Sequence, residues 1–263
     1  MHSVNAAASS IEMKPIFDAL VGGHEVWCLD LPGFGHSERP QRNYDVELFT
    51  QAVRTALAKI GRPAHVVALS LSCEFAARAA AERPDEVESL CLITPTGFSS
   101  GSDRLTTVGA TREIPGFEAF FSFGLWSRGL FDILTSKGSI RYFLRRTYGS
   151  RDVDEALVEY DWLSARQHGA QHAPFAFLSG KLFSKDVRTV YDRLSCPVFL
   201  AHGTKGDFKD FSEADWARAR RGWKVKAYDS GALVHYEQPS FIDELKTFIE
   251  RGHETLRNHA RSG

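Results

Sequence analysis

Three polar side chains that could act together in catalysis follow apolar, strand-like runs of the sequence. Ser70 ends the run at 64–70, Asp207 follows the run at 196–203, and His235 follows the run at 223–229. Serine, histidine and aspartate form the hydrogen-bonded set with which many unrelated enzymes attack a carbonyl carbon. If the runs are parallel strands, their carboxyl ends meet at one edge of a sheet, and the three side chains can share one site.

The stretch VVALSLS at 66–72 predicts a sharp turn from a strand into a helix, with Ser70 at the bend. A nucleophilic serine in this setting usually lies in the pattern G-x-S-x-G, but Ala68 and Ser72 occupy the glycine positions here. Both positions are squeezed between strand and helix, so they need small side chains, and a methyl or hydroxymethyl group meets that need. The stretch favours a nucleophilic Ser70 over a serine that only ends a strand.

Strand-like and helix-like segments alternate along the chain, which predicts an α/β fold with a mostly parallel sheet flanked by helices. The predicted strands are short and apolar on both faces, as strands covered by helices are. They lie at 24–31, 64–70, 87–94, 196–203 and 223–229.

Helices are predicted between these strands and at the end of the chain. The first opens on a capping-box pattern, with Ser9 and Glu12. Others are expected at 45–60, ended by Gly61, at 73–83, and at 240–256. Residues 99–192 show no convincing strand and predict an inserted helical cap, so 1–98 and 193–263 would form the two parts of the core.

Composition excludes several classes of function. A formal net charge of -1 gives no electrostatic basis for binding nucleic acid or an acidic membrane surface. No apolar run reaches the roughly 18 residues that span a bilayer, and the first residues lack a signal-peptide pattern. The four scattered cysteines are read as free thiols, which favours the cytoplasm. We expect a small-molecule substrate, with no cofactor and no metal; the oligomeric state is not readable.

Three stretches in the right order resemble the α/β-hydrolase superfamily, in its capped, esterase-like form. They are LDLPGFGHSERP at 29–40, the elbow around Ser70, and GALVHYEQP at 231–239. The resemblance covers nearly the whole chain. It implies that Ser70 forms an acyl-enzyme, that His235 is the general base, and that an aspartate orients the imidazole.

The same resemblance implies where the oxyanion of the reaction is held. The donors would be the backbone N–H groups of Leu71 and Val4, since HSV at 2–4 resembles the family's His-Gly-x loop with Ser3 in place of glycine. The family usually shows G-x-x-D before the acid, whereas Gly203 and Asp207 here are one residue further apart. Asp207 is favoured as the acid, and Asp210 is the alternative.

The resemblance also predicts that strands are missing before Met1. The family's strand that leads into the His-Gly loop lies between the strands expected here at 24–31 and 64–70, so we expect an N-terminally truncated chain. The leading hypothesis is a serine hydrolase that cleaves a small or medium, partly apolar carboxylic ester or thioester. Two alternatives stay open: a carbon–carbon bond hydrolase or lyase with the same triad, and a non-catalytic hydrolase-like binding module or inactive fragment.

Overall fold

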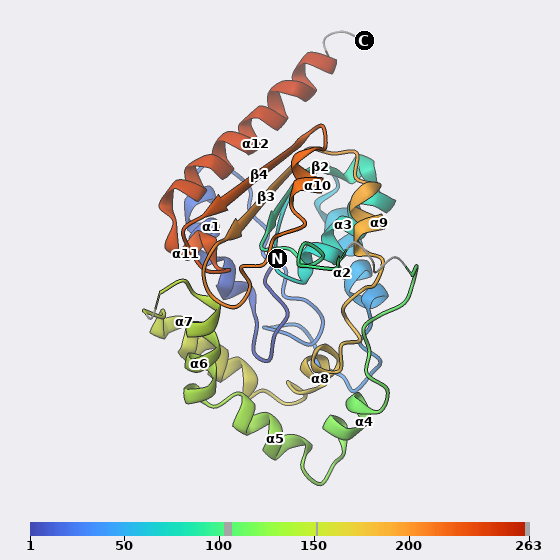
Figure 1. Ribbon diagram of the computed structural model, residues 1–263, viewed down its shortest axis with the longest axis vertical. Helices are drawn as coiled ribbons and strands as arrows, with labels where there is room; N and C mark the ends of the chain where they lie inside the picture. Colours follow the sequence, from blue (N-terminus) through green and yellow to red (C-terminus); the bar gives the residue numbers. More distant parts are fainter. Residues whose placement is uncertain (103–106, 151, 261–263) are drawn as a thin grey trace.

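The core of the molecule is a parallel β-sheet. The computed structural model describes residues 1–102, 107–150 and 152–260, with side chains up to residue 250. Within these residues the sheet has the order β1-β2-β3-β4, all parallel (Figure 1). The strands are β1 (Ala64–Leu69), β2 (Val87–Ile93), β3 (Val198–Gly203) and β4 (Trp223–Tyr228). Four of the five predicted strands and the predicted α/β class are confirmed.

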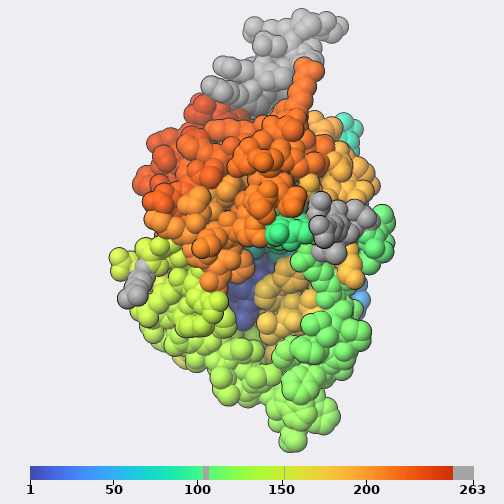
Figure 2. Space-filling view, viewed as in Figure 1, coloured from blue at the N-terminus to red at the C-terminus, as the bar shows by residue number. Residues whose placement is uncertain are grey.

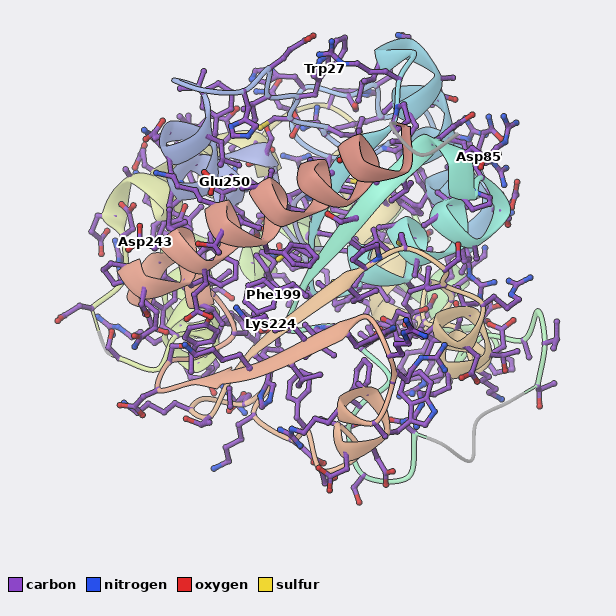
Figure 3. The ribbon with its side chains drawn as sticks, turned by 90° about the horizontal axis from the view of Figure 1, so that it is seen from above. Trp27, Asp85, Phe199, Lys224, Asp243 and Glu250 are labelled. Atoms are coloured by element: carbon purple, nitrogen blue, oxygen red, sulfur yellow. The ribbon has the colours of Figure 1, made fainter. Side chains whose placement is uncertain are left out.

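Alternating side chains of the strands bury both faces of the sheet. Leu92 and Leu200 point to one face and pack in a cluster with residues of α2, α3 and α9, whereas Ile93 and Phe199 point to the other face, toward α1 and α12. Figure 3 shows Phe199 beneath α12, where its ring lies 5.9 Å from that of Phe241. Such two-sided burial explains why the strands are apolar throughout.

The core helices follow the predicted positions closely. Helix α2 begins where the Asp45 carboxylate accepts from the Leu48 N–H at 2.9 Å, and it ends at Gly61, whose φ of 68° is easy only for glycine. The core elements are η1 (Ser10–Met13), α1 (Lys14–Leu20), α2 (Val46–Ile60), α3 (Ser72–Glu82), η2 (Pro84–Glu86), α10 (Asp215–Arg218), α11 (Val234–Glu237) and α12 (Pro239–Ala260).

A helical cap is inserted between β2 and β3. Figure 1 shows most of its helices together at one end of the molecule, with α9 returning alongside the core. Its helices are α4 (Phe117–Ser122), α5 (Ser127–Leu134), α6 (Lys137–Thr147), α7 (Glu155–Ala165), α8 (His172–Leu178) and α9 (Val187–Asp192). Helix α7 packs against η1, and α9 packs against α3, so the cap is in direct contact with the core.

Two predictions about the N-terminal third were wrong. Residues 24–31 form no strand, because the backbone of a strand needs a partner about 4.8 Å away and a groove separates this segment from β1. The capping box at Ser9 and Glu12 does not form either. Ser9 makes no side-chain cap, and the Glu12 carboxylate instead accepts hydrogen bonds from Ser3 and Asn5.

None of the helices in the described part of the chain is long and apolar enough to cross a membrane.

Candidate active site

Ser70 lies at a strained turn between β1 and α3. Its φ is 58°, a left-handed conformation that non-glycine residues rarely adopt, and its N–H donates to the Ile93 carbonyl at 2.8 Å. Ala68 and Ser72, two residues to either side, are completely buried. Ser70 itself is half-buried, so the turn presents its hydroxyl while the flanking small side chains fill the space below.

The loop at residues 2–5 is fastened to this turn. The Ser72 hydroxyl donates to the His2 carbonyl at 2.5 Å, and His2 Nε2 accepts from the Leu31 N–H at 3.0 Å. Burial lowers the pKa of His2 to about 4, so its ring is neutral at pH 7 and can accept that hydrogen bond. The backbone N–H groups of Val4 and Leu71 have no acceptor among the described residues.

Glu12 shapes the other side of that loop. One oxygen of its buried carboxyl accepts from the Ser3 N–H at 2.7 Å, and the other accepts from the Ser3 hydroxyl and the Asn5 amide, both at 3.0 Å. Burial raises the pKa of Glu12, and these hydrogen bonds oppose the rise. The sequence pattern predicts a capping role for Glu12, because spacing alone does not reveal its contact with Ser3, nine residues earlier in the chain.

His235 lies in α11 and is buried on all sides. Its Nε2 donates to the Glu12 carbonyl oxygen at 2.7 Å, and its Nδ1 has no partner among the described residues. Burial lowers its pKa to about 4, which keeps the imidazole neutral. Thr94, at the end of β2, supports the preceding loop, since its hydroxyl donates to the Ala232 carbonyl at 2.8 Å.

The loop of the expected acid begins beside the histidine loop and then turns away. A Cβ at Gly203 would lie 2.1 Å from the Gly231 carbonyl oxygen, so the two loops can touch here only because Gly203 has no side chain. Further on, the Asp207 N–H donates to the Arg146 carbonyl at 3.0 Å, and its half-exposed carboxylate pairs with the Arg146 guanidinium. This cap contact holds Asp207 at the surface.

Asp210, the alternative acid, is also exposed. Its carboxylate accepts from the Ser100 N–H at 2.9 Å and from the Ser212 hydroxyl at 2.8 Å, and these bonds lower its pKa. No hydrogen bond in the described part of the chain joins Ser70, His235 and either aspartate. The structure therefore brings the elbow and the loop of Val4 together, whereas the base and the acid point elsewhere.

A second buried acid, which the sequence pattern does not reveal, comes from the cap. Asp161 in α7 is 3% exposed, and one of its carboxyl oxygens has no partner among the described residues. Burial raises its pKa well above the usual range, and the charge of Glu12 adds to that rise. Its position on α7, which packs against η1, is a tertiary contact that no local pattern encodes.

The space between cap and core is open at the surface. Figure 2 shows a hollow there whose floor has the blue colour of the N-terminal residues. No group of three or more histidine, cysteine, aspartate or glutamate side chains in the described residues is placed to hold a metal ion. The polar groups described around the elbow are a serine hydroxyl, a neutral imidazole, two buried carboxyl groups and backbone N–H groups without an acceptor among the described residues.

Comparison with solved structures shows the same architecture in several hydrolases, at identities that establish the fold alone. An esterase from Exiguobacterium antarcticum matches with a TM-score of 0.70 at 12% identity, over 94% of this chain and 90% of its own. The epoxide hydrolase CorEH matches with a TM-score of 0.70 at 21% identity, over 92% and 88%. A meta-cleavage product hydrolase from Pseudomonas fluorescens IP01 matches with a TM-score of 0.67 at 17% identity, over 97% and 88%.

The sequence itself was compared in two ways. A search of curated proteins finds no match. The model of the alpha/beta hydrolase family matches residues 6–245, which include the elbow, the cap and the histidine loop. With the parallel sheet and the helical insertion in agreement, the chain belongs to the alpha/beta hydrolase family.

Proposed function

We propose that this protein is a serine hydrolase that cleaves small or medium, partly apolar carboxylic esters or thioesters. The observation that carries the proposal is the elbow: Ser70 is held at a φ of 58° beside a loop and a helix start whose N–H groups, at Val4 and Leu71, have no acceptor among the described residues. Free backbone N–H groups beside a nucleophile suit the oxyanion of an acyl transfer. The likeness to an esterase is consistent with this class.

In the proposed reaction, the Ser70 hydroxyl oxygen attacks the carbonyl carbon of the substrate while His235 takes the hydroxyl proton. The tetrahedral intermediate then expels an alcohol or thiol, which receives that proton, and water releases the acid from Ser70. For this the His235 ring must exchange the Glu12 carbonyl for the Ser70 hydroxyl. Its lowered pKa supports the role, because a general base must be unprotonated.

The proposed acid is Asp207. It would leave Arg146 and turn toward the Nδ1 of His235, which is buried without a partner in the described structure. The described Nδ1 is an acceptor, so the ring proton must first move from Nε2 to Nδ1, as the proposed exchange of the Glu12 carbonyl for the Ser70 hydroxyl requires. The Nδ1–H would then donate to the Asp207 carboxylate, and a buried nitrogen whose lack of a partner costs about 1–3 kcal/mol would be paired. The close approach of Gly203 to the Gly231 carbonyl supports this assignment, because the loops of Asp207 and His235 begin side by side.

Two other readings of the same site remain as alternatives. The fold is shared with a meta-cleavage product hydrolase, which supports a carbon–carbon bond hydrolase or lyase that uses Ser70 and His235. The bond between His235 and the Glu12 carbonyl, together with the outward position of Asp207, favours a non-catalytic, hydrolase-like binding module.

A fluorophosphonate probe, which phosphorylates activated serines, separates these classes. We expect one adduct, located by mass spectrometry at Ser70, that is absent in Ser70→Ala and strongly reduced in His235→Ala. A folded protein that forms no adduct would contradict the hydrolase and favour the binding module. A panel of short- and medium-chain esters and thioesters, assayed beside a carbon–carbon substrate, then distinguishes the two enzymatic readings.

A further inference from the structure

Apolar side chains gather at the free end of the cap, where α4 is connected to α5. Phe117, Phe120, Phe123, Leu125 and Trp126 are all exposed, and Leu125 is 85% exposed. We call these five residues the cap tip. Figure 1 shows the connection between α4 and α5 at the end of the molecule opposite the last turns of α12, and Figure 2 shows that end as a convex green knob. Apolar surface gathered in this way marks a site of interaction.

The aromatic rings of the cap tip touch one another and form one patch. The ring centroid of Trp126 lies 5.4 Å from that of Phe120 and 4.6 Å from that of Phe123. Phe121 connects Phe117 to this group, since its ring centroid lies 5.8 Å from that of Phe117 and 5.7 Å from that of Phe120. These separations are typical of aromatic rings in contact. The exposed rings therefore form a continuous surface.

Contacts beneath the cap tip keep its side chains at the surface. The Trp126 Nε1–H donates to the Phe120 carbonyl at 2.9 Å. On the inner side of α4, the ring of Phe121 stacks on the buried ring of Phe175 in α8, with their centroids 5.6 Å apart. Phe131 of α5 is completely buried and contacts Phe175 as well, at 5.9 Å. Because these inner rings fill the space below α4 and α5, the outer rings stay exposed to water.

The charge at the cap tip is low and of one sign. Between residues 119 and 131 the only charged side chain is that of Arg128, which is 42% exposed and shares its partner Asp132 with Arg166. A carboxylate in this stretch would be repelled by lipid phosphate groups and would be costly to transfer into a less polar phase, and the stretch has none. A single arginine beside exposed rings suits the headgroup layer of a bilayer, where phosphate groups lie next to hydrocarbon.

The size and shape of the cap tip favour a lipid surface over a second protein. Five side chains that are each about half exposed present on the order of 500 Å² of apolar surface. Stable protein interfaces bury about 800 Å² on each partner, and two convex knobs would touch over only part of their surface. A bilayer deforms around a protruding group, and aromatic side chains favour the boundary between its headgroups and its hydrocarbon.

We propose that the cap tip inserts into the headgroup layer of a zwitterionic membrane, of the phosphatidylcholine type, and binds the protein to that surface. Burial of the five apolar side chains drives the interaction, so it needs no excess of positive charge, in agreement with the formal net charge of -1. The proposal is independent of the proposed catalytic function, because the cap tip contains neither the elbow nor the loops of His235 and Asp207.

The test measures co-sedimentation with large vesicles of pure phosphatidylcholine and uses a matched pair of variants. Leu125→Asp places a carboxylate in the cap tip. Val21→Asp places the same group on the core, at the end of α1, where the side chain is 51% exposed. Since neither side chain is buried, both variants should keep the circular dichroism spectrum and the melting temperature of the wild-type chain to within a few degrees.

We expect saturable binding to these vesicles, weakened about tenfold or more by Leu125→Asp and unchanged by Val21→Asp. Binding should persist in about 0.5 M NaCl, because salt screens charges but does not weaken the burial of apolar surface. Ser70→Ala should bind as the wild-type chain does, so a failure of the proposed catalytic function would leave this result unchanged.

Trp126 provides a second readout. Its emission should shift to shorter wavelength on binding, and lipid brominated on its acyl chains should quench it. Trp126→Phe keeps an aromatic ring in the cap tip, so it should retain binding to within about threefold but lose most of the shift and the quenching. The other four tryptophans lie outside the cap tip.

Absence of saturable binding by the folded protein would overturn the proposal. Equal losses in Leu125→Asp and Val21→Asp would overturn it as non-specific adsorption. Binding that appears only with anionic phosphatidylserine and disappears in about 0.5 M NaCl would overturn it in favour of charge attraction. A concentration-dependent dimer that Leu125→Asp dissociates would also overturn it, because a second copy of the chain would then cover the cap tip.

Discussion

The elbow and the acid–base loops belong to the same candidate site, but they are organised in opposite ways. At the elbow, a strained Ser70 is packed on buried small side chains, and the adjoining loop is tied down by hydrogen bonds from Ser72 and to Glu12. In the acid–base half, His235 is bound to a backbone carbonyl and Asp207 is paired with the cap. The difference indicates that local sequence builds the turn of the proposed nucleophile, whereas tertiary contacts decide whether the proposed base and acid reach it.

Removal of the proposed base, His235, tests this difference most directly. His235→Ala should lower kcat/KM for an ester by about 10³–10⁴, since the loss of one triad member removes most of the acceleration. His202→Ala is the matched control, because His202 is also buried with a lowered pKa but stacks on Phe211 at 4.1 Å. That variant should keep kcat/KM within a few-fold, measured on protein with a native circular dichroism spectrum. Equal losses in both would mean that His235 is only a packing residue.

The environment of His235 predicts a pH dependence of stability. Its pKa is about 4 in the folded chain and about 6.5 when unfolded, so the unfolded state binds the proton first as the pH falls. The free energy of unfolding should therefore fall between pH 6.5 and pH 4 and level off below, by up to about 3 kcal/mol from this group.

The neutral isostere His235→Gln lacks this proton, so the difference between the two chains isolates the group from His2, Glu12 and Asp161. Urea unfolding at pH 7, 5.5 and 4.5 measures that difference. A constant difference across the series would show that the imidazole is not buried as described.

Variants of the two aspartates test which of them is the acid of the proposed triad. Asp207→Asn should lower the rate of fluorophosphonate labelling at Ser70 by about 10²-fold or more, because the imidazole loses the group that fixes its tautomer. Asp210→Asn, which removes a carboxylate bound to Ser100 and Ser212, should change that rate less than about threefold. The reverse ranking would assign the acid to Asp210, and no effect of either would place the acid elsewhere.

The sequence predicts what depends on neighbours along the chain. Periodicity and the glycine stop place α2 to within one residue, and the need for small side chains indicates the elbow despite the missing glycines. The failures have long-range causes. Glu12 was assigned to a cap but binds Ser3 and Asn5, and the apolar run at 24–31 finds no strand to pair with. The positions of His235 and Asp207 depend on contacts with η1 and α6, which lie far away in the sequence.

The small residues that flank Ser70 test the elbow, and we expect the smallest effects there. Ala68→Leu should destabilise the chain by about 2 kcal/mol, because a larger side chain at a completely buried position forces strand and helix apart. Ser72→Gly should cost about 1–2 kcal/mol, since it adds no volume but removes the hydrogen bond that the hydroxyl donates to the buried His2 carbonyl. Thermal unfolding gives both values, and fluorophosphonate labelling of the folded variants shows whether Ser70 stays reactive. If Ala68→Leu changes neither the thermal stability nor the labelling of Ser70, the size of this side chain does not constrain the elbow. The prediction of a nucleophile turn at VVALSLS would then depend only on the backbone conformation of Ser70.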